Sequence, residues 1–378
     1  AIRSEASLFA ASTYNNGGKD LWEWAYTINK DCLEQLKANG YELYTKCADT
    51  EKYYNNAYME YFTLNNYIGT DPSDKETIWQ SSEGYWPDPY TNPLYDVIGA
   101  PVLGNAQLTI VPSQELVDAY DMLATGKPVL DLSKPYNDEK HLSPNYNPNS
   151  GYDPANPYKG RDPRFQATVF YNNSPVLLGK EPAVVETYVG GNSEIRTSGN
   201  TNTRTGYYWR KRMVNGNCKA AGVAGYDGRF RFYRLGKIYL NAAEAAIESG
   251  HLTEGLEWIN EIRHRAGFDP SVDLSTNDKN EARLLVRQIE LACEEDRYFD
   301  IRRWTPANEN MENEKFTTGM RITKNGNSFS YERINLGTDG SKPSKMSYEK
   351  KWHVYPIPAS EAAVLEGTTG QTWQNAGW

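Results

Sequence analysis

The chain has 378 residues, 39% hydrophobic and 24% charged, which is enough for a large core in one or two domains. A net charge of −9 without a basic stripe argues against nucleic-acid binding, and no apolar run is long enough to span a bilayer. Aromatic residues make up 13%, which indicates either a tyrosine-rich core and surface or rings that stack on a ligand.

The first residues already follow a helical pattern. One face of the expected helix carries Ile2, Ala6, Phe9 and Thr13, and the pattern stops at residues 15–18. The chain starts with neither an initiator Met, a signal peptide nor a lipobox cysteine, so we expect a leading segment to be missing.

A second helix is predicted from about residue 21 to residue 39. Its apolar face consists of Leu21, Ala25, Ile28, Cys32 and Leu36. Trp22 and Trp24 are too close in sequence for both rings to face the core. The two helices should form a helix–turn–helix unit.

Residues 53–67 are polar and tyrosine-rich and are predicted to form another helix. Residues 84–93 then contain three prolines and a glycine, which prevent regular structure. This loop carries Tyr85, Trp86 and Tyr90, which we interpret as a ligand platform. The alternative is a structural plug, with Trp86 packed under residues 131–160.

Ser113 is a predicted N-cap for a helix that begins beside Glu115. Residues 131–163 are an irregular surface insertion, whose acidic side chains are better explained by solvation than by calcium. If residues 207–209 are extended, Tyr208 points opposite to Tyr207 and Trp209, so at least one of these rings belongs to the core.

Residues 229–304 form the strongest helical pattern. The first helix has an apolar face at Phe232, Leu235, Tyr239, Ala242 and Ala246 and ends near Gly250. The second has one at Leu252, Leu256, Ile259, Ile262 and Ala266. Two such helices joined by a tight turn pack antiparallel.

A third helix is predicted to open at Asp278, with Glu281 completing a capping box, and to run through Leu285, Ile289, Ala292 and Cys293. Residues 305–350 are expected to be rich in loops, and residues 352–358 to form a short strand.

Catalytic chemistry finds little support. The four histidines and four cysteines lack the spacing of metal ligands, although Cys32 and Cys47 could pair in an oxidising compartment. Residues 294–296 are three consecutive acids, which suggests either glycoside hydrolysis or ion pairing with nearby arginines; ion pairing is the simpler explanation.

Several short segments together resemble the SusD/RagB family, the surface nutrient-binding lipoproteins of Bacteroidetes outer membranes. The most specific segments keep a fixed order in residues 233–235, 239–245, 259–263, 265–267, 290–291 and 297–304. Further segments are residues 75–79, 111–120, 161–170, 205–211, 352–358 and 374–378, the last with Ala376 where the family usually has proline. The resemblance implies a short strand at residues 75–79 and another at residues 205–211.

The resemblance implies a mainly α fold with TPR-like helical pairs, an α-α superhelix, and a loop-rich region containing short β-strands. It implies one SusD-like domain over 1–378, N-terminally incomplete. Residues 1–70 and 229–304 would be the helical-repeat elements, and residues 75–228 and 305–378 the loop-rich parts.

The resemblance also implies function. It suggests non-catalytic binding of oligosaccharide or polysaccharide and delivery to a TonB-dependent SusC-like transporter. The protein would lie on the extracellular face of the outer membrane, held by an N-terminal lipid anchor not present in this chain, with no cofactor or metal. The expected ligand-binding residues are Tyr85, Trp86 and Tyr90, with Trp209 in reserve. Alternatives are a peptide-binding member of the same family and a glycoside hydrolase.

Overall fold

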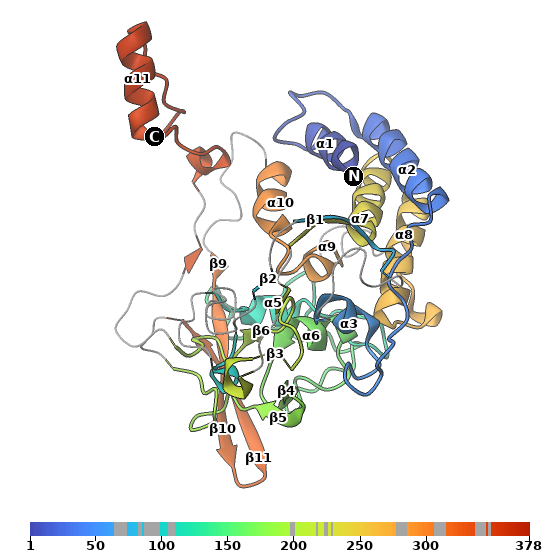
Figure 1. Cartoon of the computed structure of the whole chain (residues 1–378), viewed down its shortest axis with the longest axis vertical. Coiled ribbons are helices and arrows are strands. Elements are labelled where there is room, and N and C mark those ends of the chain that lie inside the picture. Colours follow the sequence, from blue (N-terminus) through green and yellow to red (C-terminus); the bar gives the residue numbers. More distant parts are fainter. Residues whose placement is uncertain are drawn as a thin grey trace.

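The computed structural model describes residues 1–63, 74–81, 85–86, 99–104, 110–196, 201–216, 218–222, 226–227, 230–276, 286–305, 315–336, 345–346 and 349–378, with no account of the side chains of residues 85–86, 226–227, 315 and 345–346. Helices dominate one side of the molecule, and short two-stranded sheets with long loops make up the other (Figure 1). This architecture confirms the predicted fold class.

Four helices form the helical side: α1 (Ile2–Ala11), α2 (Trp22–Ala38), α7 (Leu235–Glu248) and α8 (Leu252–Ala266). Helix α7 lies among the other three and contacts each of them (Figure 1). It is buried almost all round because its alanines 242, 243, 245 and 246 leave room for close neighbours. The two antiparallel pairs confirm the expected helix–turn–helix units.

The turn between α7 and α8 follows the predicted chemistry. Gly250 has a φ of +91°, the left-handed conformation that glycine adopts without strain. Gly255 lies against the preceding helix, since a Cβ built there would lie 3.0 Å from the carbonyl oxygen of Ala243. The tight turn and the missing side chain together bring the two helices into close contact.

Three predicted helix faces need correction, and in α2 the buried residues are Ala25, Tyr26, Asn29 and Leu33. Phe232 does not belong to α7, because residues 231–234 form a strand and the helix begins at Leu235. In α1 the buried residues are Ser4, Ser7, Leu8 and Ala11, whereas Ile2 is exposed. The hydroxyl of Ser4 donates to Asn29 Oδ1 at 2.6 Å and accepts from Asn241 Nδ2 at 3.1 Å, so polar contacts hold part of this face.

The helix expected over residues 53–67 is α3 (Ala57–Thr63), and every residue in it is buried. Beside it lies α6 (Pro163–Thr168), which begins as its sequence indicates, because Asp162 caps the first turn and Pro163 opens it. Helix α5 (Gln114–Asp118) likewise begins with the predicted N-cap, the Ser113 oxygen accepting from Leu116 N.

The strands pair antiparallel in twos. The pairs are β1 (Thr77–Gln80) with β8 (Arg231–Arg234), β2 (Tyr85–Trp86) with β7 (Tyr226–Asp227), β3 (Val169–Phe170) with β6 (Tyr208–Trp209), β4 (Ser174–Leu178) with β5 (Glu181–Val185), β9 (Lys315–Phe316) with β12 (Lys345–Met346), and β10 (Thr318–Asn325) with β11 (Ser328–Asn335). The hairpin of β10 and β11 projects from the body (Figure 1) within a region predicted to be loop.

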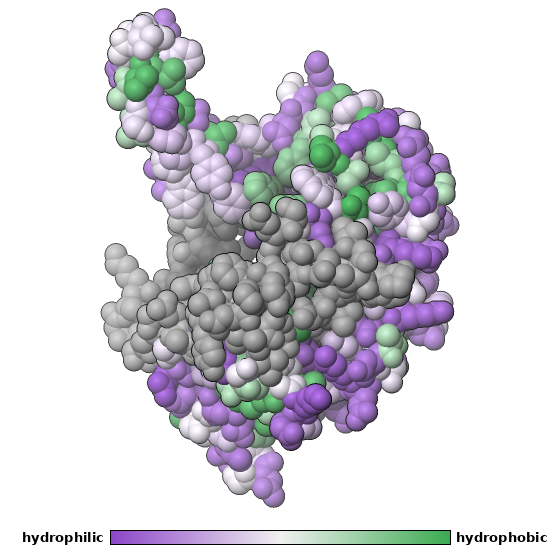
Figure 2. All heavy atoms as spheres, viewed as in Figure 1, coloured by the Kyte–Doolittle hydropathy of each residue, from purple (hydrophilic) through white to green (hydrophobic). Residues whose placement is uncertain are grey.

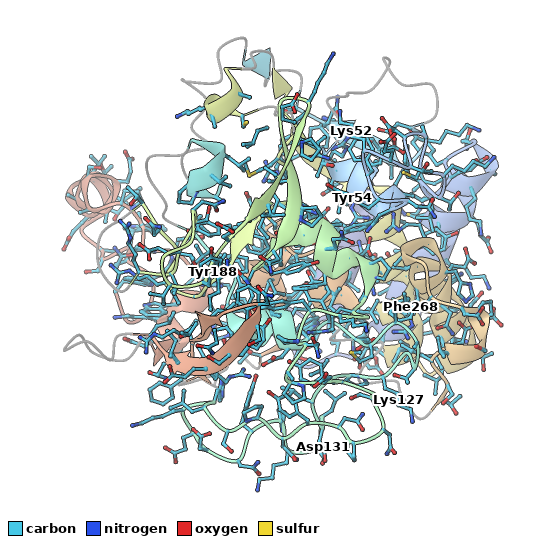
Figure 3. The ribbon with its side chains drawn as sticks, turned by 90° about the horizontal axis from the view of Figure 1, so that it is seen from below. Lys52, Tyr54, Lys127, Asp131, Tyr188 and Phe268 are labelled. Carbon is cyan, nitrogen blue, oxygen red and sulfur yellow. The ribbon has the colours of Figure 1, made fainter. Side chains whose placement is uncertain are left out.

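The region from residue 121 to residue 163 is mostly irregular, as predicted, and follows the lower edge of the view in Figure 3, where Lys127 and Asp131 are labelled. Met122, Val129 and Leu130 give it a small core of its own, covered by Tyr136, Tyr146 and Tyr152.

Short 3₁₀ turns occur at Pro101–Leu103, Lys219–Ala221, Pro270–Val272 and Lys350–His353.

The third helix of the 229–304 region ends earlier than predicted. Helix α9 (Val286–Glu290) ends before Ala292 and Cys293, and Cys293 has a positive φ of 63°. A separate helix, α10 (Asp296–Trp304), follows. The expected capping box at Asp278 lies outside the described residues.

Near the C-terminus the expected strand over residues 352–358 is absent from the described structure, since residues 350–353 form a 3₁₀ turn and an extended segment follows. Helix α11 (Ala359–Thr369) then stands apart from the body (Figure 1). The cysteines are all free, so Cys32 and Cys47 do not pair in this structure.

Candidate functional site

The strand pair of β1 and β8 presents aromatic rings to solvent. Trp79 is 50% exposed and Phe232 40% exposed, with their ring centroids 4.9 Å apart. Tyr233 stacks on Trp79 at 6.0 Å with an interplanar angle of 11°, and Phe230 contacts Phe232 at 5.2 Å. We call these four rings the aromatic surface.

The rings face outward where the pairing of the two strands is irregular. Residues two apart in a regular strand share one face, yet in β8 Phe232 is exposed while Arg234 is buried. In β1 Trp79 is exposed and Thr77 is buried. The register shifts between Thr77 and Trp79 and again between Trp79 and Gln80, and such bulges re-aim side chains, so the rings face outward while Thr77 and Arg234 form a buried inner face.

The inner face is held by ion pairs. Arg234 Nη1 lies 2.8 Å from Glu76 Oε1 and 2.9 Å from Glu290 Oε1, and its Nε lies 2.7 Å from Glu294 Oε2. Glu76 directly precedes β1, and its backbone oxygen also accepts from Leu235 N. One arginine therefore joins both strands to the loop after α9.

Arg234 belongs to a larger buried network with balanced charge. Its described members are four cations and four carboxylates, namely Arg164, Lys211, Arg234, Arg265, Glu76, Asp162, Glu290 and Glu294. Buried charges are tolerated when each has a partner and its hydrogen bonds are satisfied. This network supports the aromatic surface rigidly from below.

The network also makes Glu294 unsuitable as a general acid. Burial alone would raise the pKa of Glu294, but the charges of Arg234 and Lys211 lower it to about 2. A general acid needs a raised pKa, so Glu294 is a structural anion. The predicted ion pairing is confirmed, but the partners of Glu294 are Lys211 and Arg234 rather than the arginines next to it in sequence.

The structure describes some of the predicted site residues in full and others only in part. Tyr85 and Trp86 form β2, which pairs with Asp227 and Tyr226 of β7. Ser81 N donates to Phe230 O at 2.8 Å, so β1 and β8 remain paired as the chain leads toward β2 and β7. The side chains of Tyr85 and Trp86, and all of Tyr90, lie outside the described residues.

The Trp209 side chain packs in the core. It is 8% exposed within a core cluster that includes Phe170, Val176 and Met213. All three rings of residues 207–209 are buried, in line with the expectation that at least one belongs to the core. A ring with so little exposed surface has little face to offer a ligand.

Sequence reasoning missed Trp79 and Phe232. Trp79 was assigned only to a strand, and Phe232 was placed on the buried face of a helix. Residues 231–234 place two adjacent aromatic residues between two arginines and so do not alternate, which left no period-two signal for a strand with an exposed face.

Two further findings limit the chemistry of the described residues. Among them, no group of three or more His, Cys, Asp or Glu side chains is arranged to hold a metal ion. Within the same residues, no helix combines the length and apolarity needed to cross a membrane.

Comparison with known proteins gives a consistent picture. The profile of the SusD family matches residues 70–378. The chain is similar to the crystal structure of a SusD-like protein from Bacteroides fragilis, with 23% identity and a TM-score of 0.70, covering 100% of this chain and 64% of that one.

A SusD-like carbohydrate binding protein, also from Bacteroides fragilis, has 20% identity and a TM-score of 0.59, covering 96% of this chain and 62% of that one. The chain thus spans less than two thirds of the length of either solved structure. No curated protein matches it.

Proposed function

The chain belongs to the SusD family, and from this premise we propose that it binds oligosaccharides or polysaccharides at the cell surface and delivers them to a TonB-dependent SusC-like transporter of the outer membrane. SusD family proteins bind without catalysis. The low pKa of Glu294, which makes that carboxylate unsuitable as a general acid, agrees with this role. We place the protein on the extracellular face, held by a lipid anchor.

The observation that carries the proposal is the aromatic surface. Sugar rings have flat apolar faces, and the flat ring of Trp, Tyr or Phe can cover such a face while the sugar hydroxyls stay at the edge. Trp79 and Phe232 are exposed side by side on a strand pair fixed from below by Arg234. Rings held in place before binding lose little conformational entropy when the ligand arrives.

We propose that Tyr85, Trp86 and Tyr90 extend this surface. Strand β1 ends at Gln80, and β2 begins five residues later at Tyr85, paired with β7, which precedes β8 in the chain. Prolines 87 and 89 restrict the backbone beyond Trp86. Trp79 thus lies on the same short stretch of chain as Tyr85, Trp86 and Tyr90.

Substitution of single tryptophans tests the site. Trp79→Ala and Trp86→Ala should each weaken glycan binding at least about tenfold, the loss of about 1.4 kcal/mol of ring contact, while the melting temperature changes little. Trp24→Ala is the matched control, because Trp24 is 48% exposed on α2 and should not affect binding. Calorimetry against a panel of glycans and peptides measures the affinities.

Other outcomes of these binding measurements would contradict the proposed site or the proposed ligand. Binding that survives in both the Trp79 and Trp86 variants would place the site elsewhere. A panel in which only peptides bind would identify a peptide-binding member of the family instead. Hydrolysis of a glycan in the panel would favour a glycoside hydrolase.

The transporter partnership needs its own test. The full protein, isolated from native membranes without cross-linking, should bring with it a β-barrel channel of the SusC type. Repeated isolation without such a barrel would contradict the delivery role while leaving the glycan-binding role intact.

A further inference from the structure

Buried arginines in this protein almost always face a carboxylate. Of the arginines that the structure describes as buried, six form an ion pair with Asp or Glu: Arg164, Arg234, Arg263, Arg265, Arg287 and Arg303. Within the same described residues, Arg161 and Arg210 are the two without such a pair. The charge of these two arginines must therefore be balanced by a group other than a described carboxylate.

The charge of Arg161 is balanced by backbone groups beside it. Its guanidinium donates to the backbone oxygens of Pro157, Val117 and Tyr120. Val117 belongs to the last turn of α5 and Tyr120 follows it, where carbonyl groups point outward and carry partial negative charge. The group of carbonyl oxygens stands in for a carboxylate.

Arg210 is different. Its side chain is buried with only 4% of the residue exposed, and it donates to the backbone oxygens of Gln166, at 3.1 Å, and Pro175. The ring of Phe170 lies 4.4 Å from its central carbon, and Met59 Sδ accepts at 3.8 Å. Burial lowers the pKa of Arg210 to about 10, so the side chain still carries its charge at neutral pH.

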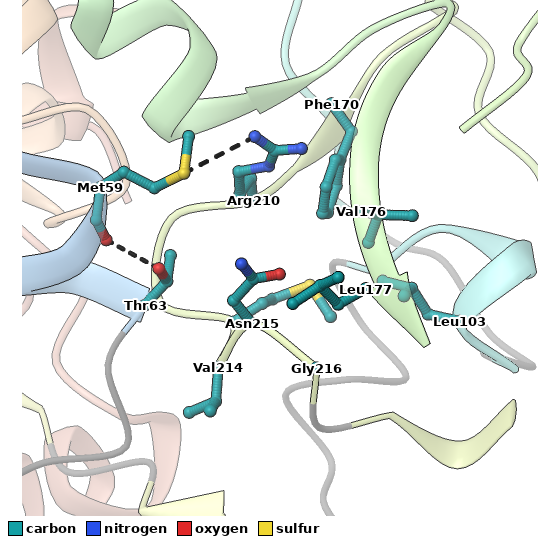
Figure 4. A pocket seen from close by; sticks show the side chains of 11 residues that line it. Met59, Thr63, Leu103, Phe170, Val176, Leu177, Arg210, Val214, Asn215 and Gly216 are labelled. Carbon is teal, nitrogen blue, oxygen red and sulfur yellow. Dashed lines mark hydrogen bonds between the residues drawn. The ribbon is translucent and has the colours of Figure 1, made fainter. Parts of the chain in front are cut away.

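A cavity lies next to this cation (Figure 4). Arg210 lines it together with Thr63, Phe170, Val176, Met213 and Asn215, contributed by α3, β3, β4 and the segment after β6. The cavity is about 10 Å³, room for one water molecule or one ion of similar size. The described residues lining it include no Asp or Glu.

The positive charge of Arg210, the N–H donors around the cavity and the size of the cavity all fit a small anionic ligand. A guanidinium has five N–H donors, and the two backbone carbonyls and the weak sulfur acceptor leave some of these free. The Asn215 amide supplies a further possible donor at the opposite side of the cavity, since only one of its hydrogens is needed for the 2.9 Å bond to Lys52 O.

We propose that the cavity beside Arg210 binds a small monovalent anion of halide size, with chloride as the occupant in physiological solution. The anion balances a buried cation that the described protein groups leave uncompensated. It also links α3 to the β3–β6 and β4–β5 strand pairs, which meet at this cavity.

Bromide shows the site directly, because it replaces chloride and scatters anomalously. Crystals of the unaltered protein soaked in sodium bromide should show an anomalous peak within hydrogen-bonding distance of the Arg210 guanidinium. Peaks at the protein surface alone, or a cavity that holds only water, would overturn the proposal.

Thermal unfolding supplies the second test. At equal ionic strength, replacing sodium gluconate by sodium chloride should raise the melting temperature of the wild-type protein, and Arg210→Met should remove this response. Arg321→Met is the control, because Arg321 lies on the surface in a pair with Glu332, and its variant should keep the response. An equal response in all three proteins would indicate a general salt effect and contradict the proposal. If Arg210→Met does not fold, the bromide experiment decides.

Discussion

Glu290 is the residue on which the buried charges converge. Its carboxylate accepts from Arg164, Arg234 and Arg265, each on a different part of the chain. Burial by itself would raise the pKa of Glu290, but these cations lower it well below its ordinary value. The charged form of this side chain is therefore part of the folded state.

Glu290→Gln keeps the shape of the side chain and removes its charge. Three buried cations then lose a shared partner, and we expect the free energy of unfolding to fall by about 3–5 kcal/mol, as measured by urea denaturation. The exposed Glu332 pairs with Arg321 at 3.5 Å, and Glu332→Gln should cost less than about 1 kcal/mol. Equal effects of the two substitutions would show that the network does not stabilise the fold as described.

Acid should unfold this protein through the same residues. The pKa values of Glu290 and Glu294 are lowered in the folded state from an ordinary value of 4.5. Their contribution is therefore present above about pH 4.5 and is lost as the pH falls through that value toward 2. Unfolding followed at a series of pH values should show stability decreasing across this interval.

Glu294→Gln provides the check on that assignment. The variant should be less stable at neutral pH and should lose less further stability as the pH falls, because one of the titrating groups is gone. A pH dependence as steep as that of the wild type would assign the acid sensitivity to other carboxylates.

At the scale of elements, the close pair of α7 and α8 depends on apolar contact. Leu256 is buried in the core cluster shared with α7. Leu256→Asp places an unpaired charge in that core, and we expect the protein not to fold. Glu257→Asp is the matched control, since the neighbouring side chain is exposed, and circular dichroism with thermal melting should distinguish the two. A Leu256→Asp variant that melts like the wild type would contradict this packing.

The sequence predicted the helices of this protein better than their buried faces. Apolar spacing located α2, α7 and α8, because a helix that buries one side must repeat its apolar residues. The face of α1 was predicted wrongly, since Ser4 and Ser7 are buried there through hydrogen bonds with Asn29. Apolar periodicity cannot detect a polar face whose partners lie elsewhere in the chain.

The strands and the candidate site were harder to predict for a related reason. Phe232 stands three residues before Leu235, a spacing that fits a helix, but the pairing of β8 with β1 decides its conformation. That pairing joins segments more than 150 residues apart in the chain, roughly the separation of Thr77 and Arg234. Exposure of Trp79 and Phe232 follows from this pairing and not from either segment alone.

At the scale of the whole molecule, α11 contributes little to the folded body. No side chain of α11 is buried, and Figure 2 shows hydrophobic residues on its outer surface. The hydrogen bonds around it are local, from Trp378 Nε1 to the oxygens of Lys351 and Val354 and between Gln374 and Ile357.

Removal of residues 359–378 should therefore leave the melting temperature of the remaining protein nearly unchanged, because no core contact is lost. Differential scanning calorimetry of the shortened and the full chain makes the comparison. A decrease of several degrees would show that this segment packs on the body in solution.

The strand pair of β1 and β8 has a consequence for how such a protein can acquire new ligands. The exposed rings of Trp79 and Phe232 and the buried ion pair of Glu76 and Arg234 occupy separate positions of the same short segments, so the exposed residues can be exchanged without disturbing those that hold the interior together. A combinatorial library confined to positions 79 and 232, with 76 and 234 kept constant, should yield mostly folded variants. Selection from such a library could redirect recognition on an unchanged scaffold, whereas randomising positions 76 and 234 would destroy most members, because the ion pair between these residues is buried.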